Sequence, residues 1–228
     1  MKTTVESIIN SLNALGNPGD LPGMSSFGMN TENRIGVRIP VLRKMAKELG
    51  RDHERALELW TTGIAEARIL AALTADPQQL TGARMEAWVS DFNSWDVCDQ
   101  VCMNLFDRTP LAWTKVREWA DREEEFVRRA AFALIACLAW HDKKAKDEDF
   151  IALLPLIKQA AGDERNFVKK AVNWALRHIG KRNPSLNKAA LELAREIREF
   201  GSRSARWIAS DAIRELESEK VQNRIRAR

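Results

Sequence analysis

Residues 124–131 read Glu-Glu-Phe-Val-Arg-Arg-Ala-Ala, and residues 164–171 read Glu-Arg-Asn-Phe-Val-Lys-Lys-Ala, so a Phe-Val-basic-basic-Ala pattern occurs twice. Phe126 and Phe167 lie 41 residues apart. A period near 40 residues, with two helices in each unit, is typical of HEAT-type repeats. Such units stack on their neighbours because none of them can bury its apolar face alone. The repeat therefore predicts an all-α, HEAT-like helical-repeat solenoid, an α-α superhelix.

Both copies carry an apolar stripe at helical spacing, and small alanines in the stripe let adjacent helices approach closely. The stripe residues are Val127, Ala130, Ala131 and Leu134 in one copy, and Val168, Ala171, Val172 and Ala175 in the next. A looser third copy reads Ser-Ala-Arg-Trp-Ile-Ala over residues 204–209. We therefore expect at least three neighbouring repeats.

Helical periodicity extends outward over most of the chain. Residues 5–15 form an apolar stripe, residues 16–23 are rich in turn formers, and Pro40 suits the first turn of a helix ending near Leu49. Residues 24–38 are ambiguous. Further helical patterns cover about 52–61, 65–74, 82–91, 94–106, 109–121, 124–140, 147–161, 164–180, 185–199 and 202–218. We predict one repeat domain over residues 1–228, with residues 1–23 as an N-terminal helix and loop.

Composition narrows the class of protein. The net charge of +4 permits binding to a polyanion, and the eight tryptophans are expected mostly to pack in a core. Three cysteines with no pairing pattern favour a reducing compartment. The scattered histidines complete no metal site and no Cys–His nucleophile pair. With no signal peptide and no apolar run of about 20 residues, we expect a cytoplasmic protein without membrane contact or cofactor.

A tryptophan and two aspartates stand close together in residues 93–100, Asn-Ser-Trp-Asp-Val-Cys-Asp-Gln. Trp95 and Asp99 are four residues apart and would share one face of a helix. Asn93 or Ser94 can cap that helix, and Asp96 then falls in the first turn, where the helix dipole favours a carboxylate. This structural role is open to Asp96 but not to Asp99. A simpler interpretation of Asp99 is a solvated or salt-bridged acid.

Basic residues occur on a second face of the repeat helices. In one repeat copy, i, i+4, i+7 spacing relates Lys170, Trp174 and Arg177. In the preceding copy, Arg129 occupies the position equivalent to Lys170. Because a solenoid presents equivalent faces along one concave surface, these residues and the Trp95/Asp99 pair are predicted to line a concave basic groove. Alternatively, the basic residues form a solvated face and Trp174 belongs to the core.

These same segments resemble the HEAT-repeat DNA glycosylases of the bacterial AlkD-type DNA alkylation repair family. The matching segments are Ser94–Asp99, Val127–Ala131, Lys170–Arg177 and Asn183-Pro184. The likeness covers about residues 24–216. The sequence departs from the family pattern in two places: Arg38 stands where a typical member has glutamine, and one tryptophan precedes Asp96 where that member has two.

The resemblance implies a function and assigns residues to it. Members excise cationic N3- and N7-alkylated purines from duplex DNA, and their lesion-facing residues match Trp95, Asp99 and Trp174 as catalytic residues. Arg129 and Arg177 match basic residues of the same wall. With Lys170 and Arg38, they are the candidate DNA-binding residues. We expect a monomeric, monofunctional glycosylase with no cofactor.

An alkylated purine is already a cation, and its departure leaves an oxocarbenium-like sugar. A carboxylate at the position of Asp99 would stabilise that charge and position a water molecule. Two alternatives remain open: a HEAT-repeat module that binds nucleic acid or protein without turnover, and a purely structural scaffold.

Overall fold

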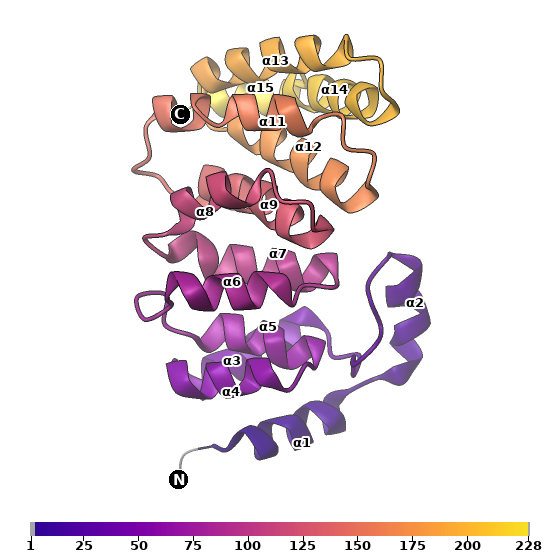
Figure 1. Cartoon of the computed structure of the whole chain (residues 1–228), viewed down its shortest axis with the longest axis vertical. Helices are drawn as coiled ribbons and strands as arrows, with labels where there is room; N and C mark the ends of the chain where they lie inside the picture. Colours follow the sequence, from indigo (N-terminus) through magenta and orange to yellow (C-terminus); the bar gives the residue numbers. More distant parts are fainter. Residues whose placement is uncertain (1–2, 228) are drawn as a thin grey trace. The chain divides into compact units, whose positions relative to one another are not determined.

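The computed structural model describes residues 3–227, and within that range it contains helices and connecting loops but no strand. The all-α prediction is confirmed (Figure 1). The helices are α1 (Val5–Leu15), η1 (Pro18–Asp20), α2 (Leu21–Ser26), α3 (Ile39–Leu49), α4 (His53–Thr61), α5 (Ala65–Thr74), α6 (Gly82–Ser90), α7 (Trp95–Asn104), η2 (Phe106–Arg108), α8 (Ala112–Trp119), α9 (Glu125–His141), α10 (Asp147–Ile151), α11 (Leu154–Ala160), α12 (Asn166–Gly180), α13 (Pro184–Arg198), α14 (Arg203–Leu216) and α15 (Glu219–Arg226).

The chain divides into two compact units, the first Met1–Pro110 and the second Leu111–Arg228. From the sequence we expected one repeat domain. In both units, pairs of helices pack in two layers, as expected for a HEAT-like fold.

Three segments differ from the sequence-based expectation. The helix expected over 147–161 is split into α10 and α11, because Pro155 in the first turn of α11 cannot continue a helix through that point. The loop expected over residues 16–23 contains η1 and the start of α2, both of which begin with a proline in the first turn. Helix α15 was not expected, and it is capped by the Ser218 side chain accepting from the Val221 amide.

In the first unit, α5 packs against α3, α4 and α7, and most of its surface is buried. The partner layer is held by aromatic packing between α4 and α6. The Trp60 and Trp88 rings stack with centroids 4.0 Å apart and planes 3° apart. The Trp60 Nε1 also donates to Asp91 at 2.7 Å, so its polar edge is satisfied. This core supports α7, which carries Trp95 and Asp99.

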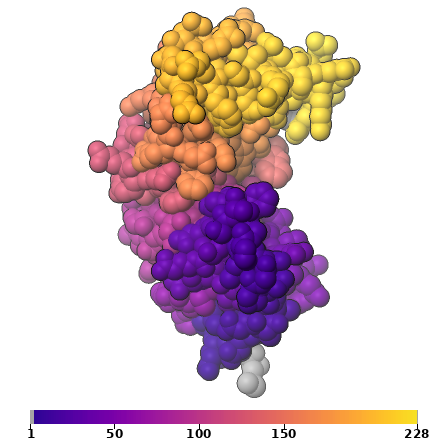
Figure 2. Space-filling model, turned by 90° about the vertical axis from the view of Figure 1, so that its right-hand side faces the viewer, coloured from indigo at the N-terminus to yellow at the C-terminus, as the bar shows by residue number. Residues whose placement is uncertain are grey.

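In the second unit, α12 packs between α9 and α14, so the helices that carry the three sequence copies are neighbours. Phe126 and Phe167 contact each other with ring centroids 5.4 Å apart. Lys169 of α12 lies over the Trp207 ring of α14 at 5.2 Å. The predicted repeat is thereby confirmed. In the space-filling view, the orange and yellow helices α13 to α15 gather at one end of this unit (Figure 2).

The tryptophans are less buried than composition suggested. Only Trp60, Trp88 and Trp119 are buried, and the expectation that most would pack in a core is wrong. The other five are partly or largely exposed: Trp95, Trp113, Trp140, Trp174 and Trp207. Among these five, Trp140 and Trp207 are the most exposed, at 46% and 40%.

One glycine sets the path of the chain between α2 and α3. Gly36 has a φ of +89°, and a Cβ there would collide with the Asn17 carbonyl. Its carbonyl accepts from the Asn17 amide at 3.3 Å. Gly50 also has a positive φ, +66°, but a Cβ on it would meet no atom within 4 Å. Substitutions at Gly50 and Gly36 therefore distinguish the cost of the backbone conformation alone from the additional cost of a steric collision.

We predict that Gly50→Ala costs about 1–3 kcal/mol of unfolding free energy, because its φ of 66° and ψ of 177° lie in a backbone region essentially restricted to glycine. Gly36→Ala should cost clearly more, because the Asn17 backbone must also move. Urea unfolding of both variants, followed by far-ultraviolet circular dichroism, measures the difference. Equal losses of stability would show that the close approach to Asn17 does not constrain the fold.

Candidate nucleic-acid interface

The start of α7 presents Trp95 and Asp99 on one side of the helix, four residues apart as predicted. Both residues are partly exposed, which confirms the predicted exposure of the Trp95 ring. The Trp95 Nε1 donates to the Phe27 carbonyl at 3.2 Å. The ring is thus anchored by its polar edge to the loop that follows α2, while part of its surface stays accessible.

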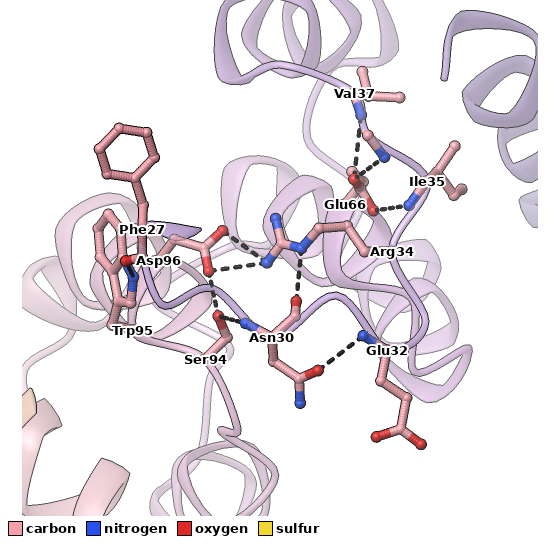
Figure 3. A network of polar contacts seen from close by, with 11 residues as sticks. Phe27, Asn30, Glu32, Arg34, Ile35, Val37, Glu66, Ser94, Trp95 and Asp96 are labelled. Atoms are coloured by element: carbon pink, nitrogen blue, oxygen red, sulfur yellow. Dashed lines mark hydrogen bonds and ion pairs between the residues drawn. The ribbon is translucent and has the colours of Figure 1, made fainter. Parts of the chain in front are cut away.

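Asp96 lies in the first turn of α7 as expected, but its carboxylate makes more contacts than a helix-dipole role requires. Its carboxylate accepts from the Arg34 guanidinium, with both oxygens 2.9 Å from Nη2, and from Ser94 Oγ at 2.5 Å (Figure 3). The Arg34 and Asp96 side chains are only 3% and 9% exposed. Ser94 is the N-cap residue as expected, but its hydroxyl bonds Asp96 instead of capping a backbone amide. Asp96 is therefore a buried structural anion.

The same network fixes the loop between α2 and α3. The Asn30 amide donates to Ser94 Oγ at 3.0 Å, and Arg34 Nε donates to the Asn30 carbonyl at 2.9 Å. Buried Glu66 accepts from the amides of residues 35, 36 and 37 at 2.8–3.2 Å, as Figure 3 shows. These amides supply the hydrogen bonds that a buried carboxylate requires. The contacts hold the loop against α5 and α7.

In the second unit, α12 carries Lys170, Trp174 and Arg177 on one face. Lys170 is exposed and Trp174 is partly exposed, so the predicted partial exposure of Trp174 is also confirmed. The Trp174 ring makes an edge contact with the His178 ring, with centroids 5.7 Å apart and planes at 86°. A ring held by one edge in this way leaves surface for another contact.

Arg129 and Arg177, both predicted to bind DNA, form intramolecular contacts. Arg129 is 5% exposed, and its Nη1 donates to the Phe167 carbonyl at 2.6 Å. Arg177 Nη1 lies 2.5 Å from a Glu215 oxygen and 3.4 Å from an Asp211 oxygen. Each arginine therefore ties its own repeat helix to the next one.

Glu215, the nearer partner of Arg177, is held ionised by its neighbours. Burial favours the neutral form of Glu215, but the Lys181 hydrogen bond at 2.8 Å and the charge of Arg177 outweigh it and lower its pKa. Asp211 also accepts from Asn173 at 2.7 Å. The two acids thus neutralise much of the positive charge on this part of α12.

Arg38 belongs to the first unit and is 72% exposed at its side chain. It pairs with Asp20 of η1 at 2.9 Å. An exposed pair of this kind is worth little and exchanges readily for another anion. Arg38 and Lys170 are the most accessible of the predicted DNA-binding residues, one in each unit.

The sequence-predicted residues therefore fall into two groups. The first unit holds Trp95, Asp99 and Arg38, and the second holds Arg129, Lys170, Trp174 and Arg177. The residues that organise these groups were not predicted, namely Arg34 and Glu66 in the first unit and Asp211 and Glu215 in the second. Arg34 and Asp96 are 62 residues apart, so no local pattern signals their contact. Arg177 and Glu215 are 38 residues apart, close to one repeat, which is a signal that a repeat alignment could have found.

Two classes of site receive no support within residues 3–227. There, no three side chains from His, Cys, Asp and Glu gather as metal ligands. No described helix is both long enough and apolar enough to cross a membrane.

Comparison with known proteins bears on what these surfaces contact. A family model described as DNA alkylation repair enzyme matches residues 8–216. The chain belongs to the DNA alkylation repair enzyme family. One curated relative in this comparison is the uncharacterised protein Lin0241 of Listeria innocua serovar 6a. It is 22% identical over 198 residues, which cover 85% of this chain and 86% of that protein.

A solved structure has the same fold as this alkylation repair family member. It is described as a new family of proteins related to the HEAT-like repeat DNA glycosylases with affinity for branched DNA structures. The match has a TM-score of 0.80 and 20% identity, and covers 98% of this chain and 96% of that chain. The HEAT-like repeat fold is thereby shown. Family and fold together support a role in DNA repair or DNA binding.

We predict that Asp96→Asn lowers the unfolding free energy by about 3–5 kcal/mol, the usual effect of breaking a buried ion pair. From sequence alone, the helix dipole suggested only about 0.3–1 kcal/mol. Glu32→Gln is the matched control, because Glu32 lies on the same loop but is exposed. Urea unfolding decides between the two values. A decrease below about 1 kcal/mol would contradict the buried pairing with Arg34.

A second prediction concerns His178. Burial, followed by the charges of Lys181 and Arg177, lowers the pKa of His178 to about 3. In the pH range between the ordinary pKa of about 6.5 and the lowered pKa of the folded state, His178 binds a proton in the unfolded chain but not in the folded chain. Stability should therefore fall as the pH drops through this window, by up to about 1.4 kcal/mol per pH unit.

Urea unfolding between about pH 6.5 and 5 measures this slope. His178→Gln should flatten it, because glutamine does not titrate. His141→Gln is the matched control, because it removes one imidazole from an exposed position. An unchanged slope in His178→Gln would mean that His178 is protonated in the folded protein.

Proposed function

We propose that this protein is a monofunctional DNA glycosylase that hydrolyses the N-glycosidic bond of cationic N3- and N7-alkylated purines in duplex DNA. The observation that carries the proposal is the separation of roles within residues 94–99. Asp96 is buried against Arg34, whereas Asp99 is partly exposed on the same helix side as Trp95. Membership of the alkylation repair enzyme family supports this proposal.

Hydrolysis of this N-glycosidic bond mainly requires a negative charge near the sugar. Loss of the alkylated base leaves an oxocarbenium-like deoxyribose, which the Asp99 carboxylate would stabilise while it orients the attacking water. At about 4 Å and an effective dielectric near 20, one such charge pair is worth roughly 4 kcal/mol. A tryptophan face against a cation adds about 0.5–2 kcal/mol. Asp99 would therefore be the dominant group. Trp95, on the same side of α7, would hold the nucleotide in place, and Trp174 of the second unit would contact the DNA.

The basic residues would divide the binding of the DNA backbone. Lys170 and Arg38 are exposed and would contact phosphates directly, which gives affinity without reading sequence. Arg129 and Arg177 would act through their contacts with the next repeat helix, by fixing where α12 presents Trp174. The protein would act as a monomer and would need no cofactor, because hydrolysis uses water as the nucleophile.

A second candidate function is DNA binding without base excision. The structural relative is described as having affinity for branched DNA structures. In this chain, the Arg129 and Arg177 guanidinium groups already have intramolecular partners. A binding module would need the basic residues and the tryptophans, but it would gain nothing from a carboxylate at Asp99, which repels phosphates.

The decisive experiment is single-turnover base release from duplexes that carry one N7-methylguanine. We expect wild-type protein to release the base, and Asp99→Asn to be about 10²–10³-fold slower, the usual effect of removing a preorganised electrostatic interaction. The affinity of Asp99→Asn for DNA should hold or rise slightly, because an anion has been removed.

Glu32→Gln is the matched control, since it also neutralises one acid of the first unit. A general change in DNA electrostatics would appear in both variants, but a catalytic effect would appear only in Asp99→Asn. If Asp99→Asn releases base as fast as wild type, the role assigned to Asp99 is wrong. If wild type binds the duplex and releases no base, the binding module is the correct function.

A further inference from the structure

A cavity in the second unit lies outside the residues proposed for base excision. Its volume is about 290 Å³. Its wall combines a large aromatic ring, an imidazole and three cationic side chains. The lining residues are Ala139, Trp140, Lys143, His178, Lys181 and Arg224. They come from the end of α9 and the segment after it, from the end of α12 and the residue after it, and from α15.

Trp140 supplies the aromatic face of this wall, with 46% of its surface accessible. Its ring stacks on the His141 ring at 4.6 Å and contacts the His178 ring edge-on at 6.4 Å. These contacts fix the plane of the ring and leave part of its surface accessible. Trp207 is exposed to a similar degree, 40%, but Lys169 lies over its ring and it does not line this cavity.

The charge of the cavity is positive. Lys143 and Arg224 are exposed, and none of the described lining residues is acidic. Lys181 is held by Glu215 at 2.8 Å, which offsets part of its charge. His178 is neutral near pH 7, because burial and the neighbouring cations lower its pKa to about 3. The wall therefore offers an aromatic face, a neutral imidazole and two exposed cations.

A ligand that matches this wall is planar and aromatic at one end and anionic at the other. Nucleobases stack on exposed aromatic side chains in a sequence-tolerant way, and neighbouring cations follow the phosphates. Bases inside a duplex are already stacked and paired, so only an unpaired or extruded base can reach a tryptophan face.

We infer that this cavity binds a nucleotide with an unpaired base, the base stacking on Trp140 and its phosphate contacting Lys143 and Arg224. The source would be a single-stranded DNA segment next to the duplex. The Trp174 ring contacts His178, which in turn contacts Trp140, so the three rings form a continuous aromatic path from α12 to the cavity. Arg224 lies beyond residues 8–216, so it is not part of what the family model matches.

The inference does not depend on base excision. It uses neither Asp99 nor the first unit, and a protein that only binds DNA would use the same cavity. Its test therefore measures binding alone. Failure of the glycosylase proposal and failure of this inference would appear in different experiments.

The test compares binding to a blunt duplex with binding to the same duplex extended by a single-stranded thymidine overhang. The overhang has about ten nucleotides, a length within the site size of single-strand binding folds. Fluorescence anisotropy of the labelled DNA measures both affinities. We expect Trp140→Ala to weaken overhang binding by roughly 5- to 150-fold, the contribution of stacking one base. Blunt-duplex affinity should change less than about twofold, because Trp140 stacks only on an unpaired base. Trp140→Phe keeps an aromatic face and should retain most of the affinity.

The cations are tested separately. Lys143→Ala with Arg224→Ala should flatten the salt dependence on the overhang by about 0.7 for each phosphate that is no longer neutralised. Lys158→Ala is the control, because Lys158 is an exposed lysine of the same unit that does not line the cavity. Thermal unfolding of each variant shows whether the fold is intact.

Three outcomes decide the inference. Weaker binding confined to the overhang, with rescue by Trp140→Phe, supports it. Equal weakening on both DNAs, or none on either, overturns it. In the third outcome, free thymidine monophosphate displaces the overhang DNA when it is added at the same concentration. That result would support a nucleotide site, but it would contradict the proposal that the nucleotide comes from a DNA strand.

Discussion

The ion pair between Arg34 and Asp96 is the constraint on which the first unit depends. It joins the loop after α2 to the first turn of α7, with Ser94 and Asn30 completing the network. The Trp95 indole bonds the same loop, at Phe27. Because both charges are buried, neither can be removed without leaving its partner unpaired in the interior. The pair therefore fixes the start of α7 and, one turn further along, the direction in which Asp99 is presented.

The second unit uses the repeat itself as its constraint. Arg129 reaches the Phe167 carbonyl, and Arg177 reaches Glu215, each 38 residues further along the chain. Both contacts run from one repeat helix to the next, in the same direction. Cationic side chains that looked like phosphate ligands thus have a second role as ties between repeats. Lys170, together with Lys143 and Arg224 beside Trp140, remains exposed and able to contact an anion.

Local sequence patterns predicted most of the fold. Helical periodicity and a repeat period near 40 residues are visible in the sequence because each repeat packs on the repeats next to it. The α9–α12 pairing followed from one repeated pattern around Phe126 and Phe167. Local pattern failed where a contact spans many residues. Asp96 had a sufficient local explanation in the helix dipole, and only the folded chain brings Arg34 to it. Likewise α15 and Arg224 follow the last clear repeat, so periodicity gave no reason to expect them beside Trp140.

The two aspartates of one motif thus have separate proposed roles, Asp96 holding the fold and Asp99 facing the reacting sugar. A crystal structure of the protein with duplex DNA containing a non-hydrolysable N7-alkylpurine nucleotide tests this most directly. We expect the Asp99 carboxylate to lie about 4 Å from C1′ of that nucleotide, the distance at which a charge pair has the strength required here. The Arg34–Asp96 pair should be unchanged. A complex in which Asp99 faces away from the DNA, or in which Asp96 leaves Arg34 to meet it, would contradict these roles.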